Sequence, residues 1–285
     1  MTSRENWIAG ARPKTLVAAI APVMVGTAFA GYDAEVTNFL LALIVGLALQ
    51  VGVNYANDYS DGIKGTDNNR VGPIRLVGSG LAQPREVKLA AFISFGVAAL
   101  AGVILSARTD WYLLLIGALA IIAAWGYTGG KKPYGYLGLG ELSVFIFFGL
   151  VATLGTYYVQ VGSLSIEVAL AAIAMGLLAT AILIVNNLRD LQRDAASGKR
   201  TLAVKLGAAK TRSLYRAALF LPLLISLLLL TTSLYFLIVL ITLPQVIRAS
   251  RTVNSGALIE LLGTTGQIQI TYSLALSLAS LLAAR

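Results

Sequence analysis

The chain has 285 residues, of which 57% are hydrophobic and only 12% are charged, and its net charge is +9. Soluble globular domains carry about a quarter of their residues as charged ones, so this chain lacks the polar side chains that a water-exposed surface needs. The composition excludes disordered, collagen-like, coiled-coil and soluble-enzyme classes, and it predicts an all-α membrane protein. Cysteine and histidine are both absent, which excludes disulfide bridges and metal sites built on thiolate or imidazole ligands.

Nine apolar stretches are predicted to cross the membrane, because each approaches the roughly 20 residues that a spanning helix needs. In chain order they are Thr15–Ala30, Phe39–Ala56, Val87–Ser106, Trp111–Tyr127, Leu139–Val159, Ile166–Val185, Leu214–Leu230, Ser233–Val246 and Thr264–Ala284. We expect one polytopic domain, residues 1–285, with a weak internal repeat in which helices one to four correspond to helices five to eight, and helix nine follows.

The distribution of lysine and arginine predicts how these spans are oriented. With a cytoplasmic N-terminus, every lysine and arginine except Arg108 and Arg285 lies on the inner side, as the positive-inside rule requires. The net positive charge is therefore an orientation signal, and we expect a lipid bilayer and no nucleic acid as partner. We expect cytoplasmic cap loops at residues 57–86, 128–138 and 188–213, and a multi-pass protein of the cell inner membrane.

The first polar cluster follows the second predicted span. Asn54, Asn57, Asp58 and Asp61 occur at i, i+3, i+4 and i+7, so on a helix they would share one face. Polar and ionisable residues at this depth are costly in a membrane, which makes them candidates for a functional site.

A second polar cluster follows the sixth span, where Asn186, Asp190 and Asp194 occur at i, i+4 and i+8. Spans two and six run in the same direction, so both acidic faces should end at the same membrane surface and face a shared cavity. The alternative interpretation is that each cluster is a solvated helix end paired with neighbouring lysine and arginine side chains.

Carboxylates gathered in this way repel one another unless a cation or a proton accompanies them. The available ligands are all oxygen atoms, which favours Mg²⁺, with Mn²⁺ possible, or Ca²⁺. The flanking loops are rich in cations, namely Lys64, Arg70, Arg75, Lys131, Lys132, Arg189, Arg193, Lys199 and Arg200. Metal, carboxylate and cation together suit a diphosphate, and a diphosphate at the mouth of an apolar cavity suits an allylic isoprenyl diphosphate.

An allylic cation formed from such a substrate needs an electron-rich surround, which aromatic rings supply. The candidate rings are Tyr55, Tyr127, Tyr134, Tyr136, Phe145, Tyr157 and Tyr158.

Motifs along the whole chain resemble those of the UbiA superfamily of intramembrane prenyltransferases, and most closely the branch that acts on 1,4-dihydroxy-2-naphthoate in menaquinone and phylloquinone synthesis. The matching segments are 11–15, 57–67, 70–75, 127–141, 155–158, 186–194 and 198–204. The spacing of the first acidic motif departs from the superfamily pattern, because Gly65 stands where the third polar residue is usual and Asp67 follows two positions later.

The resemblance implies Mg²⁺-dependent transfer of an isoprenyl chain from a polyprenyl or phytyl diphosphate to the aromatic acid, with loss of CO₂ and a demethylmenaquinol-type product. The implied metal ligands are Asn57, Asp58, Asp61, Asp67, Asp190 and Asp194. The catalytic residues among them are Asp61, Asp190 and Asp194. Diphosphate or acceptor contacts are expected from Asn54, Asn57, Lys64, Arg70, Arg75, Tyr127, Lys131, Lys132, Tyr134, Asn186, Asn187 and Arg189. The resemblance also implies nine helices around a central cavity, with the active site open on the cytoplasmic side.

Two alternatives remain at this point. The first keeps the chemistry and changes the aromatic acceptor to 4-hydroxybenzoate or homogentisate. The second is an ion-coupled secondary transporter, because polar clusters on two helices of a pseudo-repeat also suit transport. The sequence does not indicate the oligomeric state or the length of the isoprenyl chain.

Overall fold

The computed structural model describes residues 2–65 and 75–284, and the regular elements within those ranges are all helical. The α-helices are α1 (Arg4–Ala11), α2 (Val17–Ala30), α3 (Val36–Ile63), α4 (Pro84–Arg108), α5 (Leu113–Gly126), α6 (Gly140–Val144), α7 (Ala152–Val161), α8 (Ile166–Ala196), α9 (Leu202–Leu228), α10 (Leu243–Thr252) and α11 (Leu258–Ala283). Short 3₁₀ segments and one π-helical segment, Phe145–Val151, connect some of them.

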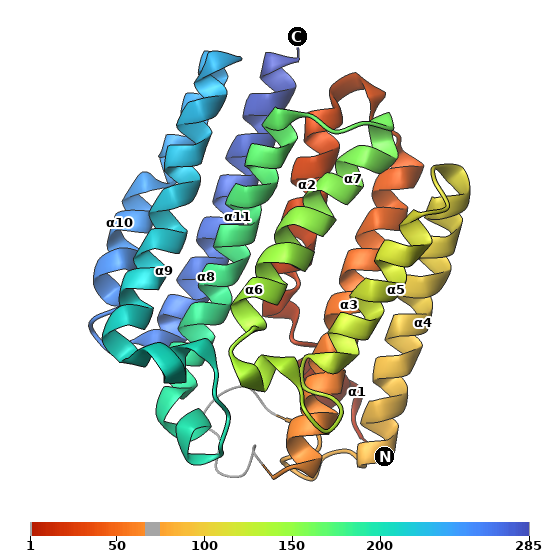
Figure 1. The fold of residues 1–285 in the computed structure, drawn as a ribbon, viewed down its shortest axis with the longest axis vertical. Coiled ribbons are helices and arrows are strands. Elements are labelled where there is room, and N and C mark those ends of the chain that lie inside the picture. Colours follow the sequence, from red (N-terminus) through yellow and green to blue (C-terminus); the bar gives the residue numbers. More distant parts are fainter. Residues whose placement is uncertain (1, 66–74, 285) are drawn as a thin grey trace.

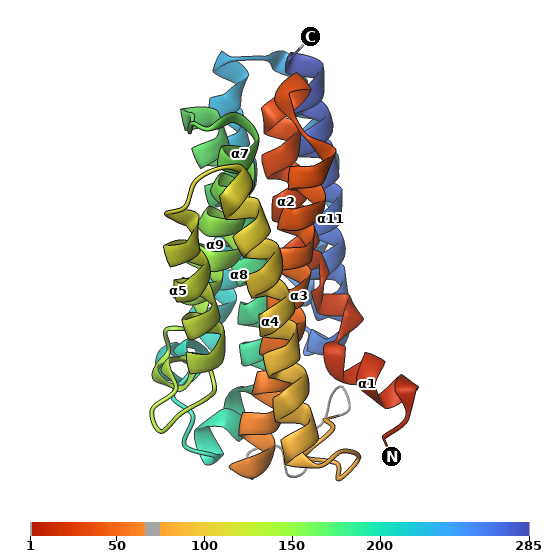
Figure 2. The same ribbon diagram turned by 90° about the vertical axis from the view of Figure 1, so that its right-hand side faces the viewer.

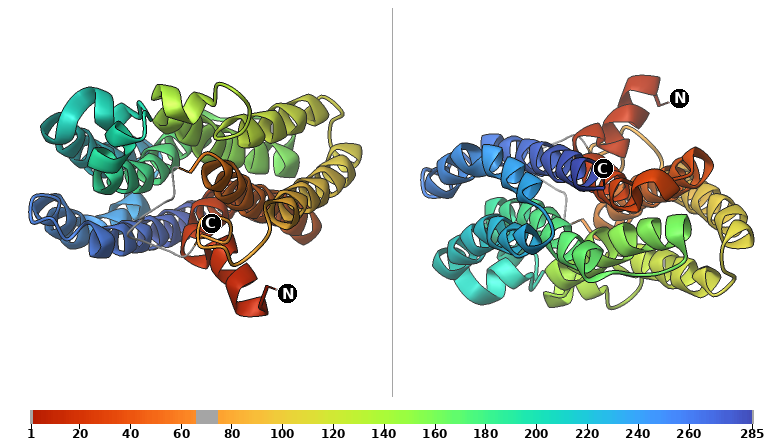
Figure 3. Two further views of the ribbon diagram at one scale, coloured as in Figure 1. Left: turned by 90° about the horizontal axis from the view of Figure 1, so that it is seen from below. Right: turned by 90° about the horizontal axis from the view of Figure 1, so that it is seen from above.

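The long helices run up and down along one axis, and the two ends of the chain lie at opposite ends of the bundle (Figure 1). Helix α1 leans away from the bundle beside the end at which α3 finishes (Figure 2). Seen along the axis, the bundle has an elongated cross-section, and α2, α3 and α8 lie toward its middle (Figure 3). We call the end that holds α1 and the last turn of α3 the polar end, and the opposite one the far end.

The predicted spans all fall on helical segments, but the number that is long and apolar enough to cross a membrane is smaller than nine. Within the described residues seven helices meet both conditions, and the pair Arg4–Thr15 and Val17–Asp33, bent by 50°, raises the number to eight. Helix α5 is apolar but has only 14 residues. An all-helical protein with seven to eight candidate spans is therefore established, and the count of nine stays a prediction.

The expected cap loops at 57–86 and 188–213 were wrong at their starting points. Helix α3 continues to Ile63 and α8 continues to Ala196, so both polar clusters lie on helical extensions of the spans. The loop predicted at 188–213 is also mostly helical, because α8 covers its start and α9 already begins at Leu202. Hydropathy marks where a helix leaves the apolar core, whereas the helix itself ends only where its backbone hydrogen bonds end.

Close backbone contacts between helices depend on a few glycines. A Cβ atom at Gly149 would collide with the backbone of Gly176 on α8, and one at Gly26 would collide with the carbonyl oxygen of Thr153 on α7. Small residues that let helix backbones approach are typical of membrane bundles. These contacts pack α2 against α7, and the segment Phe145–Val151 against α8.

Candidate active site

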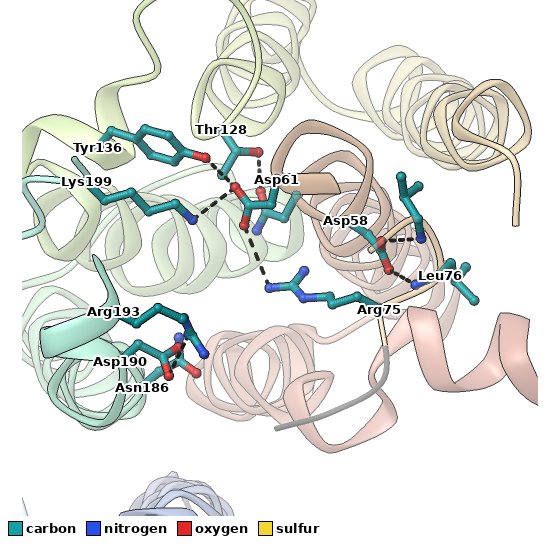
Figure 4. Close-up of polar contacts among 12 residues, drawn as sticks. Asp58, Asp61, Arg75, Leu76, Thr128, Tyr136, Asn186, Asp190, Arg193 and Lys199 are labelled. Carbon is teal, nitrogen blue, oxygen red and sulfur yellow. Dashed lines mark hydrogen bonds and ion pairs between the residues drawn. The ribbon is translucent and has the colours of Figure 1, made fainter. Parts of the chain in front are cut away.

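A cavity of about 380 Å³ lies inside the bundle, within the size range of small-molecule sites. Its polar lining comes from the two acidic clusters and from segments around them. These residues are Arg12, Thr15, Gln50, Asn54, Asn57, Asp61, Arg75, Ser106, Tyr127, Thr128, Tyr134, Tyr136, Ser143, Thr156, Asn186, Asn187, Asp190, Arg193, Asp194, Lys199 and Thr201. Asp61 of α3 and Asp190 and Asp194 of α8 thus face one cavity. It lies at the polar end (Figure 4), as the direction of the two spans predicted.

Asp61 stands where three separate segments of the chain meet. The Tyr136 hydroxyl donates a hydrogen bond to its carboxylate, and the Lys199 Nζ lies 3.1 Å from Oδ1. The Arg75 guanidinium adds a longer ion pair, with 3.8 Å between Nη2 and Oδ2 (Figure 4). Since Asp61 is almost fully buried, this ring of donors offsets the cost of keeping its charge away from water.

Asp190 contacts two arginines of its own helix. Arg189 binds it with two hydrogen bonds, of 2.8 Å from Nε and 2.7 Å from Nη2, and Arg193 Nη2 lies 2.8 Å from Oδ1. Arg189 also donates to Asn186 Oδ1 at 2.8 Å. Two-point contacts of this kind are among the stronger charge-assisted hydrogen bonds. Asp194, one turn further on, is also buried and lines the cavity.

Asn57 and Lys64 meet at Thr128, in the segment after α5. The Thr128 hydroxyl donates to Asn57 Oδ1 at 2.6 Å, and Lys64 Nζ donates to the Thr128 carbonyl oxygen at 2.8 Å. Desolvation lowers the pKa of Lys64, and the charge of Lys199 lowers it further, while Asp61 opposes both effects. These contacts fasten the end of α3 to the segment that carries Tyr136.

Asp58 takes a different position from the one that the sequence predicted. Its two carboxylate oxygens accept the backbone N–H groups of Leu76 and Val77, at 2.8 and 3.0 Å, and the residue is fully buried (Figure 4). It does not belong to the cavity wall that the described residues form. The facing turn offers two N–H groups and Asp58 satisfies them, so this geometry does not support the expected role of Asp58 as a metal ligand.

Asn54 and Tyr134 line the cavity while holding its wall in place. Asn54 Nδ2 donates to the Ala11 carbonyl oxygen at 2.8 Å and to Thr15 Oγ1 at 3.0 Å, which fixes the bend between α1 and α2. The Tyr134 hydroxyl donates to the Ala123 carbonyl oxygen at 2.8 Å, and burial raises its pKa, so it stays protonated.

Asn187 and Tyr127 also line the cavity, and Asn187 Nδ2 donates to Glu141 Oε1 at 2.9 Å. Lys131 and Lys132 are exposed, and neither belongs to the cavity wall formed by the described residues. Lys64 and Arg189 are not part of that wall either, although Arg189 is partly buried. Asp67 and Arg70 lie outside the described residues.

Several cavity residues had no predicted role, or were predicted only as members of larger groups of candidates. Lys199 and Arg193 were two of many flanking cations, and Tyr136 was one of seven candidate rings. Arg12 and Thr128 received no role, although Arg12 lines the cavity with a left-handed backbone (φ of 53°) that only glycine adopts readily. That conformation depends on the bend between α1 and α2, which hydropathy does not reveal.

The donor set fits a divalent cation that shares its coordination sphere with a substrate. Carboxylate and amide oxygens from α3 and α8 line one cavity together with cationic side chains. Within the described residues, however, no three acidic side chains come close enough to hold a metal by themselves. Mg²⁺ typically takes one or two carboxylates and completes its shell with water and substrate phosphates, which is the arrangement that these residues permit.

Comparison with known proteins agrees with the geometry. The chain matches the UbiA prenyltransferase family over residues 19–255. It is 48% identical to the 1,4-dihydroxy-2-naphthoate octaprenyltransferase of Mycobacterium tuberculosis, covering 97% of both chains. It is 43% identical to the Escherichia coli protein of the same name, covering 75% of this chain and 72% of that one.

Solved structures show the same fold at low sequence identity. A UbiA homologue from Aeropyrum pernix superimposes with a TM-score of 0.75 and 16% identity, covering 93% of this chain and 97% of that one. A UbiA homologue from Archaeoglobus fulgidus bound to DMAPP and Mg²⁺ gives a TM-score of 0.69 and 14% identity, covering 95% and 98%. With this fold, this cavity and these relatives, the chain belongs to the UbiA prenyltransferase family.

Proposed function

We propose that this protein transfers an isoprenyl group from an isoprenyl diphosphate to 1,4-dihydroxy-2-naphthoate, with loss of CO₂ and a demethylmenaquinol-type product. The observation that carries the proposal is one cavity with carboxylates and cations at the polar end and an apolar wall beyond them. That shape matches an amphiphile with an anionic head. The naphthoate as acceptor is supported by the names of relatives at 43 to 48% identity.

The cations of the polar end would bind the diphosphate. Arg75, Arg193 and Lys199 line the cavity from three different segments, so they can surround an anionic head from several sides. Asn57 and Asp61 on α3 and Asp190 and Asp194 on α8 would hold Mg²⁺, or Mn²⁺ in its place. When bound, the metal would neutralise charge on the leaving diphosphate.

The chemical step breaks the bond between the allylic carbon and the diphosphate oxygen, and the electron pair leaves with the diphosphate. The ring carbon that carries the acceptor's carboxylate bonds to the allylic carbon, and release of CO₂ returns an electron pair to the ring. A strong carbon base is not needed, which agrees with a site without histidine. One of the cavity carboxylates would take the phenolic proton that activates the acceptor. The rings of Tyr127, Tyr136, Phe147 and Phe148 line the cavity and would face the allylic cation.

The membrane arrangement that we propose has nine spans and the polar end at the cytoplasmic face of the inner membrane. The two chain ends lie at opposite ends of the bundle, which requires an odd number of crossings (Figure 1). Helix α5 then completes the nine as a short fourth span, at roughly 21 Å for its 14 residues. Since helices from both halves line one cavity, we also propose a single domain, residues 1–285, with two related halves.

The test is a reconstitution with purified protein, Mg²⁺, an isoprenyl diphosphate and the naphthoate. We expect prenylated, decarboxylated product by mass spectrometry with an equal amount of diphosphate, loss of both with EDTA, and recovery with Mg²⁺. A parallel reaction with Mn²⁺ tests the alternative metal. Preferred turnover of 4-hydroxybenzoate or homogentisate would contradict the proposed acceptor, and substrate flux without any product would favour a transporter, whose acids normally lie near the membrane midplane.

A further inference from the structure

The cavity extends far beyond the polar cluster. Asp61 and Ala42 both line it, and on α3 they are separated by roughly 28 Å at 1.5 Å per residue. This is close to the whole hydrocarbon thickness of a bilayer, about 30 Å. Beyond the carboxylates the wall is almost entirely apolar, and α2, α3, α4, α5, α7 and the segment Phe145–Val151 all contribute to it.

Three glycines stand along this apolar part: Gly102 on α4, Gly117 on α5 and Gly155 on α7. A Cβ atom added at any of them would meet no described atom within 4 Å. They differ in this from Gly26 and Gly149, where a Cβ would collide with the backbone of a neighbouring helix. Helix packing therefore explains Gly26 and Gly149 but not these three, whose missing side chains leave space inside the cavity.

The cavity is bounded at the far end. Val23, Ala42, Leu105 and Val159 form a small buried cluster there, and each of them also lines the cavity.

Beyond that cluster, polar contacts tie the helix ends together. Asn38 donates to the Val159 carbonyl oxygen at 2.8 Å, and Arg108 donates to Asn38 at 2.9 Å and to Glu35 at 2.9 Å. An apolar chain that enters from the polar end therefore passes the glycines before it reaches the closed end of the cavity.

We propose that Gly102, Gly117 and Gly155 set the length of isoprenoid tail that this enzyme accepts, by keeping the far half of the cavity free of side chains. The inference rests on the proposed function and adds the class of donor: long isoprenyl diphosphates use the space beside the glycines, whereas a two-unit donor ends before reaching it. A bulky side chain at these positions would shorten the usable cavity without touching the polar end.

The experiment compares Gly102→Leu and Gly117→Leu with Gly96→Leu. Gly96 is a matched control, since it also lies on α4 and a Cβ there also meets no described atom within 4 Å, but it is not part of the cavity wall. For each protein, kcat/KM is measured with geranyl diphosphate and with an octaprenyl diphosphate. The readout is the ratio of the two values, which cancels differences in folded fraction.

We expect the ratio of octaprenyl to geranyl kcat/KM to fall at least about tenfold in both cavity variants, because pocket size discriminates on this scale. Gly96→Leu should keep the wild-type ratio. Gly102→Ala should lower the ratio by a smaller factor. This variant replaces the leucine variants in the comparison if they do not fold.

An unchanged ratio in active cavity variants, or an equal fall in Gly96→Leu, would overturn the inference and leave the proposed function intact. If the wild-type protein turned over neither donor, that result would instead contradict the proposed function itself.

Discussion

The acidic clusters of α3 and α8 have similar spacing in the sequence but are used differently in the structure. Each places an asparagine four residues before an aspartate. On α8 both Asp190 and Asp194 line the cavity, whereas on α3 Asp61 lines it and Asp58 binds backbone N–H groups of the turn at Leu76. Spacing places side chains on one helix face, but what lies opposite that face decides what each one does.

The partners of the two central carboxylates differ as well. Asp190 is held by arginines one and three positions away on its own helix. Asp61 is held by Tyr136, Lys199 and Arg75, which come from three segments distant in sequence. The arginine contacts of Asp190 thus form within α8, whereas the contacts of Asp61 form only when the polar end of the bundle closes around it.

The largest expected effect comes from the cavity carboxylates that both halves of the site contribute. Asp61→Asn and Asp190→Asn each remove one negative charge from the cavity while keeping the size of the side chain. We expect kcat/KM to fall by about 100-fold or more in each, since a site that stabilises developing charge loses effects of this order with one group. The measurement is kcat/KM for the isoprenyl donor, from initial rates over a range of donor concentrations. Near-wild-type rates in both variants would remove these aspartates from the proposed metal site.

A smaller effect tests the long-range support of Asp61. Tyr136→Phe removes the hydroxyl that donates to the Asp61 carboxylate but keeps the ring beneath Lys199, whose Nζ lies 4.6 Å from the ring centroid. We expect activity to fall roughly tenfold, as when a supporting partner of a metal ligand is lost. The Mg²⁺ concentration for half-maximal rate should rise in this variant. An unchanged Mg²⁺ dependence would mean that the hydroxyl does not position Asp61.

Asp58→Asn should act on stability rather than on metal binding. The amide keeps one acceptor oxygen for the N–H groups of Leu76 and Val77 but turns its NH₂ group toward the other, which costs roughly 1–3 kcal/mol in a buried position. Thermal unfolding in detergent should show a lower midpoint, while the Mg²⁺ dependence of the remaining activity stays at the wild-type value. A shifted Mg²⁺ dependence with an unchanged midpoint would restore Asp58 as a metal ligand.

The sequence predicts the helical segments and the shared polar end because these depend on local properties. Hydropathy over a span and the i, i+4 spacing of Asn186 and Asp190 can be read without knowing what packs against them. The different roles of Asp58 and Asp61 could not be read in this way, because they depend on where the turn at Leu76 folds back against α3.

The same reasoning explains why the sequence alone does not distinguish the cations of the cavity from those of the surface. Lys199 and Lys132 look alike in the sequence, since both follow a span and stand in a basic segment. In the structure Lys199 reaches Asp61, while Lys132 is exposed, because the segment that carries Tyr136 turns back toward the cavity between them. That turn brings the N–H of Arg200 to the carbonyl oxygen of Tyr136, at 3.0 Å, which is a tertiary contact with no local signal.

The smallest expected effect separates these two kinds of lysine. Lys131→Gln and Lys132→Gln, alone or together, should change kcat/KM by less than about twofold, because exposed charges interact weakly through water. Lys199→Gln removes the same charge from the cavity, leaves Asp61 with fewer donors, and should weaken binding of the diphosphate, seen as a higher KM for the isoprenyl donor. If the surface pair raises that KM as much as Lys199→Gln does, then the segment at 128–138 must fold over the bound substrate, and its lysines would count as part of the site.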